Sequence, residues 1–234
     1  MNSTIRTKSK NLGVIIKRSW LCQDRYYCWP LYICDKPYLV FTLAMEERPV
    51  LQSSYESGEG WVNFGQGSIG FPATYESHSG FVTAWHCIEL STNYINDEVY
   101  GQVYSGSRDL DYAFVMQENS SISISRDIYR HTKSLTKGGY GFVGQGSEVG
   151  RTGYGSGYGD GKVTYTGVNN NLGEDLIQTD CGSMAGDSGG PYFTHPTTVP
   201  YAAGIHIGGY NDPDNDITYF RGMSYLYDAG YRIE

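Results

Sequence analysis

Short apolar runs alternate with turn residues along most of the chain, from Trp61 to the C-terminus. Runs of four or five residues, bounded by Gly, Asn and Asp, recur at 80–84, 111–115, 162–166, 176–179 and 201–205. Strands this short, joined by turns of this composition, predict an all-β sandwich or barrel. A helix is expected only near the end, over 222–230, and no long internal repeat is visible.

The N-terminal part of the sequence differs from the rest. It has no steady period, and it ends in a polar stretch, 52–60, that is typical of a linker. Residues 1–58 hold 8 Lys or Arg and 5 Asp or Glu, whereas 59–234 hold 9 and 20. We therefore expect an accessory or propeptide-like segment over 1–58 and one folded domain over 59–234.

Composition narrows the classes of protein that fit. The 234 residues include 31 Gly and 22 Tyr, while only 18% are charged, which disfavours a helical bundle, a coiled coil or a disordered tail. A net charge of −8 disfavours nucleic acid as a partner. The best candidate for a membrane segment, 38–45, is too short to span a bilayer, and no clear signal peptide is found, so we expect no membrane partner.

Three short strings carry residue types that suit nucleophilic catalysis: Thr83-Ala-Trp-His-Cys87, Asp109-Leu-Asp-Tyr-Ala-Phe-Val115 and Gly186-Asp-Ser-Gly-Gly-Pro191. A serine hydroxyl is a poor nucleophile until an imidazole takes its proton, and the imidazole needs a carboxylate to fix its tautomer. Taken singly, the three strings also fit a structural histidine, a turn-capping aspartate and a glycine-rich hairpin. Their His, Asp, Ser order, with spacings of 25 and 77 residues, predicts a catalytic triad.

The glycines around the serine have a further use. They let the loop turn tightly, so that the N–H groups of Gly186 and Ser188 can point together at a developing oxyanion. We expect a side chain at Gly186 to obstruct this arrangement.

On these strings the sequence resembles the chymotrypsin-like serine proteases, and within them the compact bacterial branch of streptogrisins and alpha-lytic-type enzymes. The resemblance covers about three quarters of the chain, over 61–234. It implies two packed six-stranded antiparallel β-barrels with a C-terminal helix, and a triad of His86, Asp111 and Ser188 between the barrels. It selects Asp111 over Asp109, which is expected to be a solvated turn residue.

The resemblance also implies roles for residues around the triad. Arg151 is similar to an internal arginine of the bacterial branch and is expected to pair with Asp187 beside the serine. Substrate would bind along walls that include Ser183, Ala185, His206, Ile207, Gly208 and Gly209. His206 suggests cleavage after Glu or Asp, because an imidazole can donate to a substrate carboxylate. Ala185 lacks the hydroxyl that glutamate-specific members of the family use near this histidine. Two alternatives therefore stay open: His206 could be a structural residue of its strand, and the enzyme could prefer a hydrophobic residue before the cut.

The cysteines depart from the family pattern. The chain has five, at positions 22, 28, 34, 87 and 181, so they cannot all pair internally. Cys87 and Cys181 lack the partners that the resemblance would supply. The resemblance implies secretion, while unpaired thiols fit a reducing compartment equally well, so an intracellular location stays open.

These observations predict a serine endopeptidase that works through an acyl-enzyme, acts on peptides or proteins as a monomer, and needs no metal or organic cofactor. Two alternatives remain. The chain could be a catalytically silent homologue used as a binding module, or a tightly specific processing enzyme of viral or intracellular origin.

Overall fold

The computed structural model describes residues 5–9, 12–16, 53–62, 66–88, 92–95, 98–194, 196, 198–212 and 215–234. The chain forms two compact units, Met1–Arg48 and Pro49–Glu234. In the first unit, β1 (Ile5–Ser9) pairs antiparallel with β2 (Leu12–Ile16). The second unit begins about ten residues before the boundary expected near residue 58. It does so because β3 (Ser53–Ser57) pairs with a strand of that unit and Tyr55 lies in its core.

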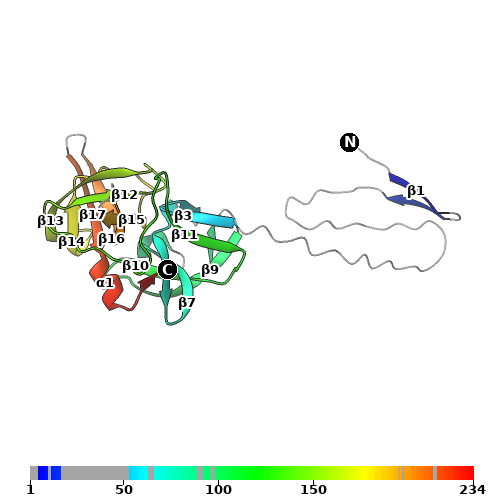
Figure 1. Cartoon of the computed structure of the whole chain (residues 1–234), viewed down its shortest axis with the longest axis horizontal. Helices are drawn as coiled ribbons and strands as arrows, with labels where there is room; N and C mark the ends of the chain where they lie inside the picture. The colour runs from blue at the N-terminus through cyan, green and yellow to red at the C-terminus, as the bar shows by residue number, and fades with distance from the viewer. Residues whose placement is uncertain are drawn as a thin grey trace. The chain divides into compact units, whose positions relative to one another are not determined.

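Six strands in the C-terminal half of the second unit close into a barrel in the order β12-β13-β14-β17-β16-β15 (Figure 1). Their bounds are β12 Glu148–Arg151, β13 Gly159–Asn170, β14 Gly173–Thr179, β15 Pro191–Thr194, β16 Tyr201–Asp212 and β17 Asn215–Gly222. Every strand pair is antiparallel. The barrel interior is filled by a cluster of buried side chains: Val149, Val163, Cys181, Tyr192, Ala203 and Phe220. Removal of their apolar surface from water stabilises the barrel.

The N-terminal half of this unit is an antiparallel sheet in the order β18-β6-β7-β10-β9-β8. Its strands are β6 Phe71–Tyr75, β7 His78–Thr83, β8 Asn93–Ile95, β9 Glu98–Ser107, β10 Tyr112–Gln117 and β18 Arg232–Ile233. Two smaller pairs lie outside it: β4 (Gly60–Val62) with β5 (Gln66–Ser68), and β11 (Ile122–Ile128) with β3.

The expectation of two closed barrels is therefore confirmed only in part. Among the described residues, no strand ladder joins β11 or β3 to either edge of the six-stranded sheet, so this sheet stays open. The reason lies in β11, which pairs in parallel with β3, and the register of this pair breaks between Ile124 and Ile128. A strand from before the expected domain boundary thus occupies the hydrogen-bonding edge of β11.

One hydrophobic cluster joins the barrel to the open sheet. It combines Phe71, Val82 and Phe114 of the sheet with Phe193 and Ile205 of the barrel. The single α-helix of the described chain, α1 (Met223–Asp228), follows β17 and adds Leu226 to the same cluster; after it, β18 crosses back to pair with β6. The expected C-terminal helix is confirmed, and the helix ties the end of the barrel to the sheet that carries the histidine string.

No helix in the described ranges has the length and apolar character needed to cross a membrane.

Candidate active site

His86 and Asp111 come together at one end of the open sheet. His86 lies on a short 3-10 helix, η1 (Trp85–Cys87), directly after β7, and Asp111 lies in the turn between β9 and β10. The His86 backbone N–H donates to Asp111 Oδ1 at 3.0 Å, and His86 Nδ1 lies 2.7 Å from Asp111 Oδ2. One carboxylate therefore holds both the backbone and the ring of the histidine, with the proton on Nδ1 and Nε2 left as an acceptor.

The surroundings of His86 shift its proton affinity. Burial by itself lowers the pKa of the imidazole, but the hydrogen bond with Asp111 and the adjacent Cys87 thiol both raise it. The raising effects are larger together, so the pKa of His86 lies above its ordinary value of 6.5. A histidine with raised proton affinity is a stronger base once it is neutral.

The pH dependence of the peptide hydrolysis predicted from the sequence should follow this shift. Only the neutral imidazole can accept a proton, so kcat/KM should rise with pH along an acid limb whose midpoint lies above 6.5. The measurement is kcat/KM between pH 4 and 10 in buffers of constant ionic strength, with folding followed by circular dichroism. A midpoint below 6.5 in folded protein would contradict the role of Asp111 and Cys87 in raising the pKa.

The loop that carries Ser188 packs against the end of β7, next to His86. A Cβ added to Gly189 would lie 2.1 Å from Thr83 Oγ1, and Gly189 has a φ of +85°, so only glycine fits here. The Ser188 carbonyl accepts a hydrogen bond from the Ser68 N–H at 2.7 Å and a weaker one from the Cys87 thiol at 3.6 Å. Serine and histidine segments that are 101 residues apart are thus in direct contact.

Within the part of the chain that the structure describes, the two N–H groups expected to bind an oxyanion meet no competing acceptor. Among the described residues, neither the Gly186 N–H nor the Ser188 N–H donates a hydrogen bond, and the Ser188 hydroxyl makes none to His86. The Gly186 carbonyl is held by Ser68 Oγ at 2.7 Å. The expected reason for Gly186 needs correction. A Cβ there would meet no atom closer than 3.5 Å, and what requires glycine is a φ of +98°.

Asp187, the residue before Ser188, holds the serine loop in place through its buried side chain. Its fully buried carboxylate pairs with Arg151 Nη1 at 3.0 Å, as the resemblance implies, and the Arg151 side chain is 5% exposed. Three further donors surround it: the Met184 N–H at 2.8 Å, the Ser156 N–H at 2.9 Å and the Ser156 hydroxyl at 2.5 Å. A buried carboxylate with one ion pair and three hydrogen bonds is a rigid support for the turn that it occupies.

Replacement of Arg151 should therefore damage both folding and activity. Arg151→Met leaves Asp187 as an unpaired buried charge, and we expect a loss of about 3–5 kcal/mol in the free energy of unfolding. Urea unfolding of the wild type, Arg151→Met and the exposed control Lys137→Met measures this loss. The double variant Arg151→Met/Asp187→Asn should recover part of the stability. A single variant as stable as the control would show that the pair is not structural.

The predicted substrate-binding residues lie on two segments that meet beside Ser188. Ser183 and Ala185 precede the serine turn, and Ser183 Oγ would be 2.9 Å from a Cβ at Gly209, which lies on β16 with Ile207 and Gly208. The structure therefore brings both expected walls together. Ile207 is buried at 4% exposure, so its side chain belongs to the core rather than to an open surface.

His206 is part of the framework of the site. Its N–H donates to the Gly190 carbonyl and its carbonyl accepts from the Gly189 N–H, both at 2.8 Å. His206 is 2% exposed, and its imidazole stacks on Tyr192. The ring Nδ1 has no hydrogen-bond partner among the described residues. Burial, and then the Arg151 guanidinium, lower the pKa of His206 to about 3, so the ring is neutral near pH 7.

Two supporting residues were not identified from the sequence. Ser68 holds the Gly186 and Ser188 carbonyls, and Ser156 donates twice to Asp187. Neither serine lies in a recognisable motif, and Ser68 is 118 residues from Gly186, so no local signal could have revealed its role.

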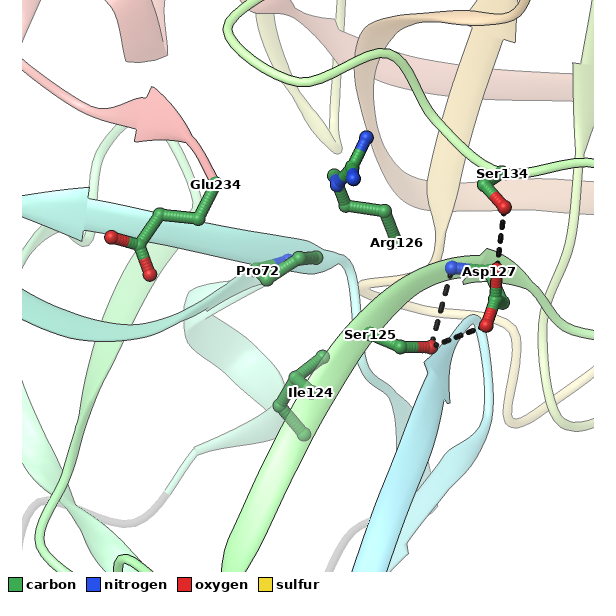
Figure 2. A pocket seen from close by; sticks show the side chains of 7 residues that line it. All are labelled: Pro72, Ile124, Ser125, Arg126, Asp127, Ser134 and Glu234. Atoms are coloured by element: carbon green, nitrogen blue, oxygen red, sulfur yellow. Dashed lines mark hydrogen bonds between the residues drawn. The ribbon is translucent and has the colours of Figure 1, made fainter.

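The other cysteines and hollows of the described residues offer no second candidate site. Cys87 and Cys181 are buried free thiols, while Cys22, Cys28 and Cys34 lie outside the described residues. No group of three or more metal-binding side chains occurs in the described ranges. A hollow of about 350 Å³ lies elsewhere in the second unit. Figure 2 shows the side chains that line it: Pro72, Ile124, Ser125, Arg126, Asp127, Ser134 and Glu234. Its hydroxyls are already bonded to Asp127, and it contains none of the predicted site residues.

Comparison with known proteins places this geometry in context. The chain is 30% identical over 171 residues to streptogrisin-D of Streptomyces griseus, an alignment that spans 68% of this chain and 42% of that protein. The chain thus covers less than half the length of this relative. No family model matches.

Solved structures agree with the sequence match. A Nocardiopsis protease is 25% identical with a TM-score of 0.66, covering 78% of this chain and 100% of that one. A glutamic acid-specific serine protease, described as using a histidine triad in substrate binding, is 23% identical with a TM-score of 0.65, covering 76% and 100%. The resemblance seen in the motifs is confirmed: in sequence and in fold, this chain is like the chymotrypsin-like serine proteases of bacteria.

Proposed function

We propose that the chain is a serine endopeptidase whose triad is His86, Asp111 and Ser188. The observation that carries this proposal is the two-point contact of one carboxylate with His86, made where the Ser188 loop packs on the same segment. The similarity to streptogrisin-D and to solved bacterial proteases supports the reaction class.

The chemistry follows from these positions. Ser188 Oγ attacks the carbonyl carbon of the substrate peptide bond while His86 Nε2 accepts its proton, and Asp111 stabilises the imidazolium that forms. The free N–H groups of Gly186 and Ser188 stabilise the oxyanion of the tetrahedral intermediate. His86 then protonates the leaving amine, and the acyl-enzyme is hydrolysed by water through the same steps in reverse order. No step requires a metal or an organic cofactor.

For the residue before the cut, we infer a hydrophobic preference over the acidic one. His206 can offer a hydrogen bond to a carboxylate, which supports Glu or Asp, but its neutral, buried ring offers no charge. The Asp216 carboxylate also disfavours an acidic substrate side chain. It lies close to Gly182, 3.0 Å from where a Cβ on that glycine would stand, and Gly182 is next to Ser183 of the predicted substrate-binding segment. Like charges that lie close together repel each other.

A peptide panel tests activity and preference together. Five peptides of identical flanking sequence carry Phe, Leu, Glu, Asp or Lys before one cleavable bond, and Lys is included because of Asp216. We expect Ser188-dependent cleavage, fastest after Phe or Leu. Fastest cleavage after Glu would restore the acidic preference, and fastest cleavage after Lys would indicate that Asp216 selects the substrate. Well-folded protein that cleaves none would favour the binding module.

Secretion and a removable N-terminal segment remain predictions of the resemblance and of the charge distribution. Intact mass of the active protein is the relevant measurement, and retention of Met1 in fully active protein would contradict removal of the segment.

A further inference from the structure

Arg221 of β17 is a buried cation on which the charges of Asp175 and Asp111 act without forming an ion pair with it. It is fully buried, and it is the largest of the fully buried side chains among the described residues. Among the described residues it forms no ion pair, and only neutral groups accept its hydrogen bonds. Arginine is rarely buried without a paired carboxylate, because its charge must leave water. A role beyond packing would account for a buried arginine at this position.

The surroundings are shaped to receive this guanidinium. Arg221 Nη1 donates to the Glu174 carbonyl at 2.5 Å, and its Cζ lies 5.1 Å from the centre of the Tyr225 ring. A Cβ on Gly173, which has a φ of +153°, would stand 3.1 Å from Nη2. Glycine at this position therefore leaves room for the planar group.

The remaining contact reaches across from the barrel to the catalytic turn. Arg221 Nε donates to the Leu110 carbonyl at 2.9 Å, and these residues are 111 positions apart. Leu110 immediately precedes Asp111, which adopts a φ of +53°. A non-glycine residue in this left-handed region is strained and keeps its conformation only when its neighbours hold it. The other local support is modest: the Leu110 N–H donates to Ser107 Oγ at 3.2 Å, and the Asp111 N–H donates to the Arg108 carbonyl at 3.3 Å.

We infer that Arg221 is a positioning residue for Asp111: it fixes the Leu110–Asp111 peptide group from the barrel side, and so sets the angle at which the carboxylate meets His86. This inference rests on the proposed function of the triad. It also gives β17 of the barrel a role in the site, in addition to the serine loop and the predicted substrate-binding segments that the barrel contributes. The geometry of the acid–base pair then depends on a contact between the two halves of the unit.

The test compares Arg221→Met and Arg221→Lys with the wild type. Met removes every donor, while Lys keeps the charge but not the planar fork that reaches two carbonyls at once. For Arg221→Met we expect kcat to fall by about 10²-fold with little change in KM, because a displacement of about 1 Å in a catalytic group has this effect. Arg221→Lys should lie between Met and wild type.

A second readout separates positioning from stability. The proton between His86 Nδ1 and Asp111 Oδ2 should give a far-downfield NMR signal in the wild type, and this signal should weaken or shift in Arg221→Met. Leu226→Ala is the matched control, since Leu226 is fully buried in the hydrophobic cluster that joins the two halves. It should lower stability while leaving kcat and the NMR signal unchanged below its unfolding temperature.

The outcomes are distinct. Wild-type protein without Ser188-dependent hydrolysis would overturn the proposed function itself. An active wild type with unchanged kcat and NMR signal in folded Arg221→Met would overturn only the role of Arg221. If neither variant folds, the wild type decides: the Arg221 Nε–H should be protected from solvent exchange and should show scalar coupling to the Leu110 carbonyl carbon. Absence of that coupling would also overturn the inference.

Discussion

Ser188→Ala should reduce kcat for peptide hydrolysis by about 10⁴- to 10⁶-fold while leaving the fold intact. The Ser188 hydroxyl is the group that the proposed mechanism acylates, so its removal leaves the oxyanion donors and substrate binding. The measurement is single-turnover hydrolysis of the best peptide of the panel, with circular dichroism and thermal unfolding on the same samples.

The matched control for this variant is Ser120→Ala. Ser120 is an exposed serine in the turn before β11, and it lies in neither the serine loop nor the substrate walls. Its replacement should leave kcat and KM at wild-type values. Substantial hydrolysis by Ser188→Ala would identify another nucleophile, and the mechanism proposed for this chain would then be wrong.

Asp111→Asn is the second large effect, with an expected fall in kcat of about 10⁴-fold. The neutral amide can no longer stabilise an imidazolium, and its NH₂ group favours the tautomer in which Nδ1 of His86 is the acceptor. Nε2 would then carry the proton and could not take one from Ser188. The acid limb of the remaining activity should move to lower pH, since the carboxylate that raises the pKa of His86 is gone.

Asp109→Asn provides the control for this prediction. Asp109 is exposed, stands two residues upstream and was expected to be a solvated turn residue. Its replacement should leave the rate and the pH profile unchanged. An Asp109→Asn variant that loses activity while Asp111→Asn retains it would reassign the acid of the triad.

Local sequence patterns account for most of the strands. The apolar runs at 80–84, 162–166, 176–179 and 201–205 lie in or overlap β7, β13, β14 and β16, and the run that starts at Asp111 becomes β10. These elements could be predicted because apolar runs bounded by turn residues are a property of neighbouring residues. The helix before Gly230 was predictable for the same reason.

Pairing between distant strands was less accessible. The parallel pairing of β3 with β11 joins Ser53 to Ile122, and it leaves the N-terminal sheet open. Neither segment has a sequence pattern from which this pairing could be predicted. The domain boundary was displaced by the same effect. The basic residues that end before the linker marked a change in composition, whereas hydrogen bonds to β11 decide where the compact unit begins.

The candidate site divides in the same way. His86, Asp111 and Ser188 stand in strings whose chemistry requires those residue types, so they could be found without coordinates. Ser68 and Arg221 are ordinary residues whose importance comes from single contacts with carbonyls more than 100 positions away. His206 shows the limit of a motif, because the sequence left a structural and a substrate-binding role both open, and only the coordinates give its burial and its neutral ring.

Covalent labelling by a fluorophosphonate tests the central claim most directly. The reagent phosphonylates a serine hydroxyl only where a neighbouring base and an oxyanion site activate it. Intact mass followed by peptide mapping should show one adduct on wild-type protein, located on Ser188, a much slower reaction in Asp111→Asn and none in Ser188→Ala. A folded wild type that remains unlabelled, or an adduct that persists in Ser188→Ala, would contradict the account.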